Sequence, residues 1–262
     1  MSRLHVHDDG GRGHHDDAAT VVWLGSLGSS AAMWQPQLDR MRTAGFPARH
    51  VRVDLPGHGA SPGGPAPTTI AGIAAEVVAA LDASGVGRAH VVGLSIGAMV
   101  GMRLAVDHAD RVDRLALLCT SAHLGPASAW HERAALVRTE GTRAVAVAVT
   151  GRWLTPEYAA GRPDEVATLT SMVASTDAEA YACCCEAIAA MDLRDDLPSI
   201  QVPTLVIAGE ADPATPPTHA DVIAALVPGA RLEIVPGAHL ASWESADTVT
   251  ALLIDHLGGT HR

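Results

Sequence analysis

The sequence has no lysine and no asparagine, so all 18 of its basic residues are arginines. Without lysine, the chain cannot form a P-loop, a Schiff base with a carbonyl substrate or a Ser–Lys dyad. Without asparagine, it has no acceptor for N-linked glycosylation. The two absences therefore exclude several catalytic classes before any motif is considered.

Positive charge is scarce as well. The 18 arginines are outnumbered by 29 acidic residues, which leaves a formal net charge of −11 at pH 7. An acidic chain repels nucleic acid and anionic lipid, so we expect neither as a partner.

Long hydrophobic runs are missing and cysteines are few. No stretch reaches the roughly 18 apolar residues that a membrane span needs, and residues 1–11 lack the apolar run of a signal peptide. The four cysteines show no C-x-x-C spacing, which indicates neither a zinc knuckle nor a disulfide framework. We therefore predict a cytoplasmic protein with no membrane partner and leave its oligomeric state open.

Short apolar segments alternate with segments of helical composition. The chain is 262 residues long and 48% hydrophobic, which suffices for a large core. Six short segments, rich in β-branched residues, are typical of strands buried on both faces. They are residues 20–25, 50–55, 89–94, 112–119, 204–209 and 231–235. This pattern predicts an α/β fold with a mostly parallel, doubly wound sheet.

One long stretch interrupts the alternation. Residues 121–197 contain no strand-like segment and have helical composition throughout. The most economical interpretation is a helical cap over the carboxyl edge of the sheet, where open α/β folds bind their ligands. We therefore expect an α/β core of residues 1–120 and 198–262, and a cap of residues 121–197.

A G-x-S-x-G motif occupies residues 93–97, between an expected strand and an expected helix. A nucleophilic serine in that place lies on a sharp, strained turn, which requires very small residues two positions away on either side. Gly93 and Gly97 meet this requirement, so Ser95 is the predicted nucleophile.

A serine hydroxyl needs a base, and the base needs an acid that orients it. Asp212 and His239 each follow an expected strand, so both can converge on Ser95 at the carboxyl edge of the sheet. The chain order Ser, Asp, His is that of α/β-hydrolase triads. Asp212 is preferred to Glu210 because its Asp-Pro pair marks the loop that leaves the sheet.

Acyl transfer also needs two N–H donors for the oxyanion. The expected donors are the backbone of Ile96, directly after the nucleophile, and of Leu27, in the glycine-rich loop after the first strand.

This chemistry requires no metal and no cofactor. Several histidines near the N-terminus lie among aspartates, but in a segment expected to be an irregular loop rather than a rigid metal scaffold. They are His5, His7, His14 and His15.

Five strings occur in the order typical of the α/β-hydrolase superfamily: SLGSS, DLPGHGAS, GLSIGA, GEADPATPP and PGAHLASWE. Strings in the expected cap are more specific, and with them the chain most resembles the 3-oxoadipate enol-lactonases of aromatic-compound catabolism. These are Trp130 with Arg133, GRWLT at 151–155, ACC at 182–184 and MDLR at 191–194.

The resemblance runs through essentially the whole chain. It implies a cap inserted after the sixth strand, and a hydrolase that uses no cofactor. It also implies the reaction, the opening of 3-oxoadipate enol-lactone to 3-oxoadipate through an acyl-enzyme, in the catabolism of catechol and protocatechuate. Carried over position by position, the catalytic residues are Ser95, Asp212 and His239, with Leu27 and Ile96 as oxyanion donors.

The implied lactone carries a carboxylate side chain, which a chain of net charge −11 must bind with a local cation. Arg133 and Arg152 are the expected cations, because each lies next to a tryptophan or one helical turn from it. Those tryptophans, Trp130 and Trp153, would form an apolar wall for the lactone ring.

Two other functions stay open. A general carboxylesterase or perhydrolase would use the same three residues on a neutral acyl substrate. A hydrolase-fold ligand-binding protein would bind without turnover, although it has no physical need for nucleophile, base and acid together.

Overall fold

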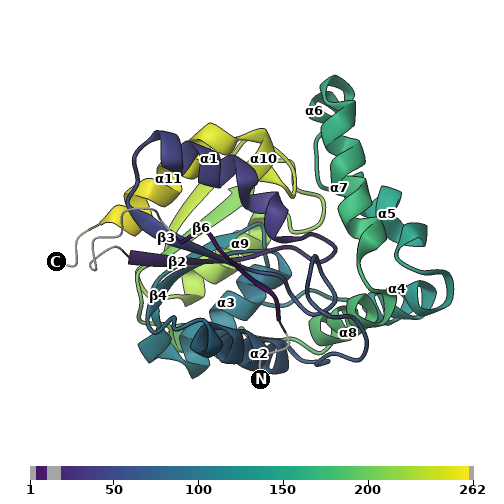
Figure 1. Cartoon of the computed structure of the whole chain (residues 1–262), viewed down its shortest axis with the longest axis horizontal. Helices are drawn as coiled ribbons and strands as arrows, with labels where there is room; N and C mark the ends of the chain where they lie inside the picture. The colour runs from purple at the N-terminus through teal and green to yellow at the C-terminus, as the bar shows by residue number, and fades with distance from the viewer. Residues whose placement is uncertain (1–3, 11–18, 260–262) are drawn as a thin grey trace.

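The computed structural model describes residues 4–10 and 19–259, and a seven-stranded sheet forms its centre (Figure 1). The strand order is β1-β3-β2-β4-β5-β6-β7; β1 pairs antiparallel with β3, and the other pairs are parallel. The strands are β1 (Val6–Asp8), β2 (Ala19–Leu24), β3 (Ala48–Val53), β4 (Ala89–Leu94), β5 (Val112–Leu118), β6 (Thr204–Gly209) and β7 (Arg231–Val235). The six expected strands are all present, and the α/β fold is confirmed.

Helices cover both faces of the sheet. Figure 1 shows α1 (Gln35–Thr43) and α11 (Ala246–Gly258) on one face, and α2 (Ile70–Ala83) and α3 (Ile96–Asp107) on the other. Every residue of β4 and β6 is therefore buried, which explains their continuous apolar sequence. The remaining core helices are η1 (Ala31–Trp34), η2 (Ala109–Arg111), η3 (Leu197–Ser199), α9 (Pro217–Leu226) and α10 (Ala241–Glu244).

Five α-helices lie between β5 and β6, and Figure 1 shows them to one side of the sheet. They are α4 (Ala127–Glu140), α5 (Arg143–Thr150), α6 (Pro156–Gly161), α7 (Pro163–Ser175) and α8 (Ala178–Ala189). We call residues 121–197 the helical insertion. It follows the fifth strand of the described residues, so the expected position after a sixth strand is wrong. A position after a sixth strand would require one more strand before the insertion. In the described part of the chain, only the three-residue β1 precedes β2, so β5 is the fifth strand.

The two ends of the helical insertion lie side by side. The N–H of Leu193 donates to the carbonyl oxygen of Ala122 at 2.8 Å, and His123 pairs with Asp192 in an antiparallel bridge. The chain therefore enters and leaves the insertion at adjacent points, which we call the neck (residues 122–123 and 192–193).

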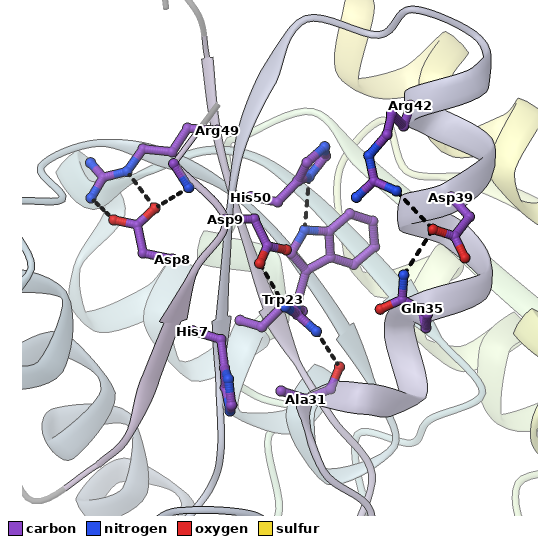
Figure 2. Close-up of polar contacts among 12 residues, drawn as sticks. His7, Asp8, Asp9, Trp23, Ala31, Gln35, Asp39, Arg42, Arg49 and His50 are labelled. Carbon is purple, nitrogen blue, oxygen red and sulfur yellow. Dashed lines mark hydrogen bonds and ion pairs between the residues drawn. The ribbon is translucent and has the colours of Figure 1, made fainter. Parts of the chain in front are cut away.

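The expected irregular loop near the N-terminus instead begins with strand β1. Its register is held by ion pairs to β3: Asp8 bonds Arg49 at 2.5 Å, and Asp9 bonds Arg52 at 2.7 Å (Figure 2). His14 and His15 lie outside the described residues. Among residues 4–10 and 19–259, no group of histidine, cysteine or acidic side chains is arranged to hold a metal ion. Each helix in the same ranges is too short or too polar to cross a membrane.

Two half-buried histidines make stability depend on pH. His50 accepts a hydrogen bond from the indole of Trp23 at 3.2 Å (Figure 2), and His256 donates one to the carbonyl of Leu115 at 3.0 Å. Burial lowers the pKa of each histidine to about 4. Below about pH 6.5, the ordinary pKa of histidine, these two side chains therefore bind protons in the unfolded chain but stay neutral in the folded chain. This difference favours the unfolded chain.

We expect the contribution of these two histidines to the free energy of unfolding to be constant above about pH 7 and to fall between pH 6.5 and pH 4. Each histidine contributes roughly 1–2 kcal/mol to that fall by pH 5. Urea unfolding at pH 7 and pH 5 measures it, and His50→Gln, which cannot take a proton, removes its share. Equal stability at the two pH values would contradict the prediction.

Candidate active site

Ser95 lies in a strained turn between β4 and α3. Its φ of 55° and ψ of −120° fall in a region that residues other than glycine rarely adopt. Two contacts hold the turn: the N–H of Ser95 donates to Leu118 at 3.0 Å, and the hydroxyl of Thr120 donates to the Ser95 carbonyl at 2.9 Å. The strain therefore persists because the surrounding strands and helix fix the backbone.

Both flanking glycines are required by space. A Cβ on Gly97 would lie 2.3 Å from the carbonyl oxygen of Leu24, and one on Gly93 would lie 2.5 Å from the nitrogen of Ala98. These neighbours are backbone atoms and cannot rotate away. The small residues that the motif requires thus let helix α3 start directly against the sheet.

Asp212 and His239 form a buried pair in the loops after β6 and β7. The Nδ1–H of His239 donates to Oδ2 of Asp212 at 2.8 Å, and the hydroxyl of Thr215 donates to the same oxygen at 2.7 Å. The other carboxylate oxygen accepts the N–H groups of Ala214 and Thr215. Glu210, by contrast, is exposed.

The carboxylate of Asp212 is held in its ionised form. Burial on its own would raise the pKa of Asp212, but the charge of His239 and the hydrogen bonds from His239 and Thr215 outweigh it and lower that pKa. An ionised Asp212 fixes the His239 tautomer that leaves Nε2 unprotonated, which a general base requires.

Ser95 and His239 line a cavity of about 230 Å³ between the core and the helical insertion. Leu27 lines it from the loop after β2. Asp212 stands behind His239, and Ile96 is fully buried next to Ser95. In the part of the chain that the structure describes, the N–H groups of Leu27 and Ile96 have no hydrogen-bond acceptor.

The helical insertion contributes the opposite wall. All four side chains expected there line the cavity: Trp130, Arg133, Arg152 and Trp153. The backbone carbonyl of Trp153 accepts the N–H of Leu240, the residue after His239, at 2.7 Å. The insertion is therefore bonded directly to the loop that carries His239.

The two cavity arginines lie close enough for the charge of one to act on the other. The Arg133 guanidinium lies 4.6 Å from the centre of the Trp130 ring. Burial, and then the charge of Arg133, lower the pKa of Arg152. Within the described residues, neither arginine forms an ion pair with a carboxylate, whereas Arg138 on the outer side bonds Glu179 at 2.9 Å. Two unneutralised cations in one pocket favour an anionic ligand.

Sequence reasoning missed Tyr181 of α8. Its side chain is fully buried and lines the same cavity, where its hydroxyl lies beside the guanidinium of Arg133. Burial raises the pKa of Tyr181, so the hydroxyl keeps its proton and can donate it in a hydrogen bond. The available signal was weak: a bulky polar residue among the small ones of AEAYACCC, and one of two tyrosines in the chain.

The comparisons with known proteins agree with this fold. Residues 13–252 match the sequence model of the alpha/beta hydrolase family, and the chain belongs to that family. Within it, the chain is 33% identical to 3-oxoadipate enol-lactonase 2 of Acinetobacter baylyi over 228 residues, which cover 87% of this chain and 84% of the relative. The expected resemblance to the enol-lactonases is confirmed.

Two further relatives carry the names of different hydrolases. The crystal structure of the enol-lactonase from Burkholderia xenovorans LB400 superposes with a TM-score of 0.92 at 38% identity, covering 98% of this chain and 96% of that chain. A protein of Variovorax paradoxus named as carbamate hydrolase RutD is 33% identical over 251 residues, 92% of either chain. The chain is thus a hydrolase of this family that is similar to enol-lactonases.

Proposed function

We propose that the protein is a cofactor-independent lactonase that opens 3-oxoadipate enol-lactone to 3-oxoadipate in the catabolism of catechol and protocatechuate. The observation that carries this proposal is one cavity in which Ser95 and the Asp212–His239 pair face two arginines without acidic partners. Ester-cleaving groups and an anion-binding wall are the two features that a lactone with a carboxylate side chain requires.

In the proposed reaction, Ser95 attacks the lactone carbonyl and His239 takes the hydroxyl proton. The N–H groups of Leu27 and Ile96 stabilise the oxyanion of the tetrahedral intermediate. The ring C–O bond then breaks, and the enol oxygen receives the proton from His239. Water, deprotonated by His239, attacks the acyl-enzyme; the ester bond to Ser95 breaks and its oxygen regains the proton.

We further propose that the helical insertion acts as a cap and that residues 1–120 and 198–262 form the catalytic core. In this division the core supplies the catalytic groups, and the cap supplies Trp130, Trp153 and the arginines for the substrate. We also propose the cytoplasm as the location. All four cysteines are free thiols, which suits a reducing compartment.

Hydrolysis of the enol-lactone by the purified protein, followed by its ultraviolet absorbance, tests the proposal. We expect kcat/KM for the enol-lactone to exceed that for p-nitrophenyl acetate by at least about ten-fold, the gain of one charge-assisted contact. A preference for neutral esters would instead identify a general carboxylesterase or perhydrolase. No turnover of either substrate, nor of a carbamate, would favour a ligand-binding protein.

The relative named as a carbamate hydrolase supports a second candidate, because the same nucleophile and oxyanion donors can act on a carbamate carbonyl. Faster hydrolysis of a carbamate than of the enol-lactone, in parallel assays, would favour it.

Replacing one cavity arginine tests what binds the substrate carboxylate. We expect Arg133→Met or Arg152→Met to raise KM for the enol-lactone ten-fold or more, a loss of about 1.5–3 kcal/mol for a charge-assisted contact. Hydrolysis of neutral p-nitrophenyl acetate should barely change. Arg143→Met is the matched control, because Arg143 is an exposed arginine of the same insertion. If both cavity variants bind the lactone normally, the carboxylate site lies elsewhere.

A further inference from the structure

The loop after β2 is held by a buried histidine from the DLPGHGAS segment. The N–H of Gly28 donates to Nε2 of His58 at 2.8 Å, and Nδ1 of His58 lies 2.8 Å from the carbonyl oxygen of Pro56. Because a carbonyl oxygen only accepts, Nδ1 carries the proton and Nε2 is left as the acceptor. The two contacts therefore fix one neutral tautomer of His58.

The other end of that loop is held by Asp54. Its Oδ1 accepts the N–H of Ala31 at 2.6 Å, and its Oδ2 accepts the N–H of Ala60 at 2.9 Å. His7 of β1 also donates to Oδ2, at 2.8 Å, and Arg52 reaches the carbonyl of Ala31 at 3.5 Å (Figure 2). Ala31 is thus bonded through both its N–H and its C=O.

These contacts act on the peptide plane next to Leu27. The Gly28 N–H belongs to the peptide unit that joins Leu27 to Gly28, so its bond to His58 fixes the backbone rotation of Leu27. Gly28 itself has a φ of 84°, a conformation that needs glycine and that the loop could lose without such a bond. The Leu27 N–H itself lies in the preceding peptide unit, whose Ser26 carbonyl accepts the N–H of Ser29 at 3.0 Å and its hydroxyl at 2.7 Å. His58 therefore holds the turn next to this donor rather than the donor's own peptide plane.

The surroundings of His58 favour its neutral form. Burial is the largest influence and lowers the pKa of His58, although the Pro56 carbonyl and the charges of Asp54 and Asp177 act in the opposite direction. A second proton would have to go on Nε2, where it would meet the N–H of Gly28. Nε2 of His58 thus stays unprotonated at ordinary pH and can accept the N–H of Gly28.

We propose that His58 and Asp54 are positioning residues that hold the turn from which the Leu27 N–H reaches the oxyanion. They touch no substrate atom, and they act through Gly28 and Ala31. This inference rests on the proposed role of Leu27 as an oxyanion donor. It gives the DLPGHGAS segment a task in catalysis beyond that of a tight turn beside the site.

The test compares three replacements of His58 in the hydrolysis of p-nitrophenyl acetate, which needs the oxyanion donors but not the carboxylate site. We expect His58→Ala to lower kcat by about ten-fold to a hundred-fold with KM within about two-fold, because a displaced donor fails in the transition state alone. His58→Gln offers an amide oxygen to Gly28 and should restore kcat to within about five-fold of wild type. His58→Leu fills the space without an acceptor, and it replaces the alanine variant if that variant does not fold.

His256→Ala is the matched control, because it too removes a histidine that bonds a backbone carbonyl, and His256 is half-buried and away from the cavity. It should lower the melting temperature and leave kcat unchanged. A folded His58→Ala or His58→Leu with wild-type kcat overturns the inference, and so does a Gln variant as slow as the alanine one. The lactonase proposal fails separately, if the wild type cleaves p-nitrophenyl acetate but not the enol-lactone.

Discussion

Ser95→Ala is expected to lower kcat by at least about three orders of magnitude and to leave the fold intact. The variant removes the only atom that forms the acyl-enzyme, while the backbone contacts that hold the turn stay in place. His239→Ala should cost about as much, and the double variant should cost little more, because nucleophile and base act as a unit. Steady-state hydrolysis of the enol-lactone and of p-nitrophenyl acetate measures all three variants.

The control for this series is Ser84→Ala, which deletes a hydroxyl that bonds the carbonyl of Ala80 at the end of α2, away from the cavity. It should keep wild-type kcat. More than a tenth of the activity in folded Ser95→Ala would mean that another group is the nucleophile. Additive losses in the double variant would mean that His239 does not act through Ser95.

The second large effect is expected at Gly97. Gly97→Ala should destabilise the protein by at least about 4 kcal/mol, because the new methyl group would meet the carbonyl oxygens of Leu24 and Gly25 at 2.3 Å and 2.6 Å. Neither oxygen can move without shifting β2 or helix α3. Urea unfolding, or the soluble yield if the variant does not fold, measures the loss.

Gly87→Ala is the matched control. A Cβ at Gly87 would have no atom within 4 Å, and its φ lies outside the left-handed region. The substitution should be neutral or stabilise by about 0.5 kcal/mol, through the lower entropy of the unfolded chain. Equal stability of the two alanine variants would contradict the close packing at the turn.

The sequence suffices to predict what is set by local chemistry. The residues around Ser95 specify a strand, a tight turn and a helix within a few positions. Buried parallel strands can be predicted because their sequences are continuous apolar runs. The places of Asp212 and His239 follow because each lies in the loop after a strand, although β7, before His239, is a partly exposed edge strand. Here local pattern and tertiary position coincide.

Features that depend on packing between distant segments were not predictable. Strand β1 is three residues long and forms by pairing with β3, so its own sequence carries little signal. Tyr181 faces the cavity because α8 packs against α4, which decides which side of the helix points inward. Periodicity within residues 121–197 predicts helices but not their relative orientation.

The neck, where Ala122 and Leu193 lie side by side, determines how the helical insertion can be altered. Since the helices α4–α8 leave and rejoin the sheet at adjacent points, they can be lengthened, shortened or exchanged as a module without altering the register of β5 and β6. The residues proposed to break the ester bond and those proposed to bind the substrate then lie on segments that can be changed separately. A laboratory exchange of the helices between relatives would start at these two residues.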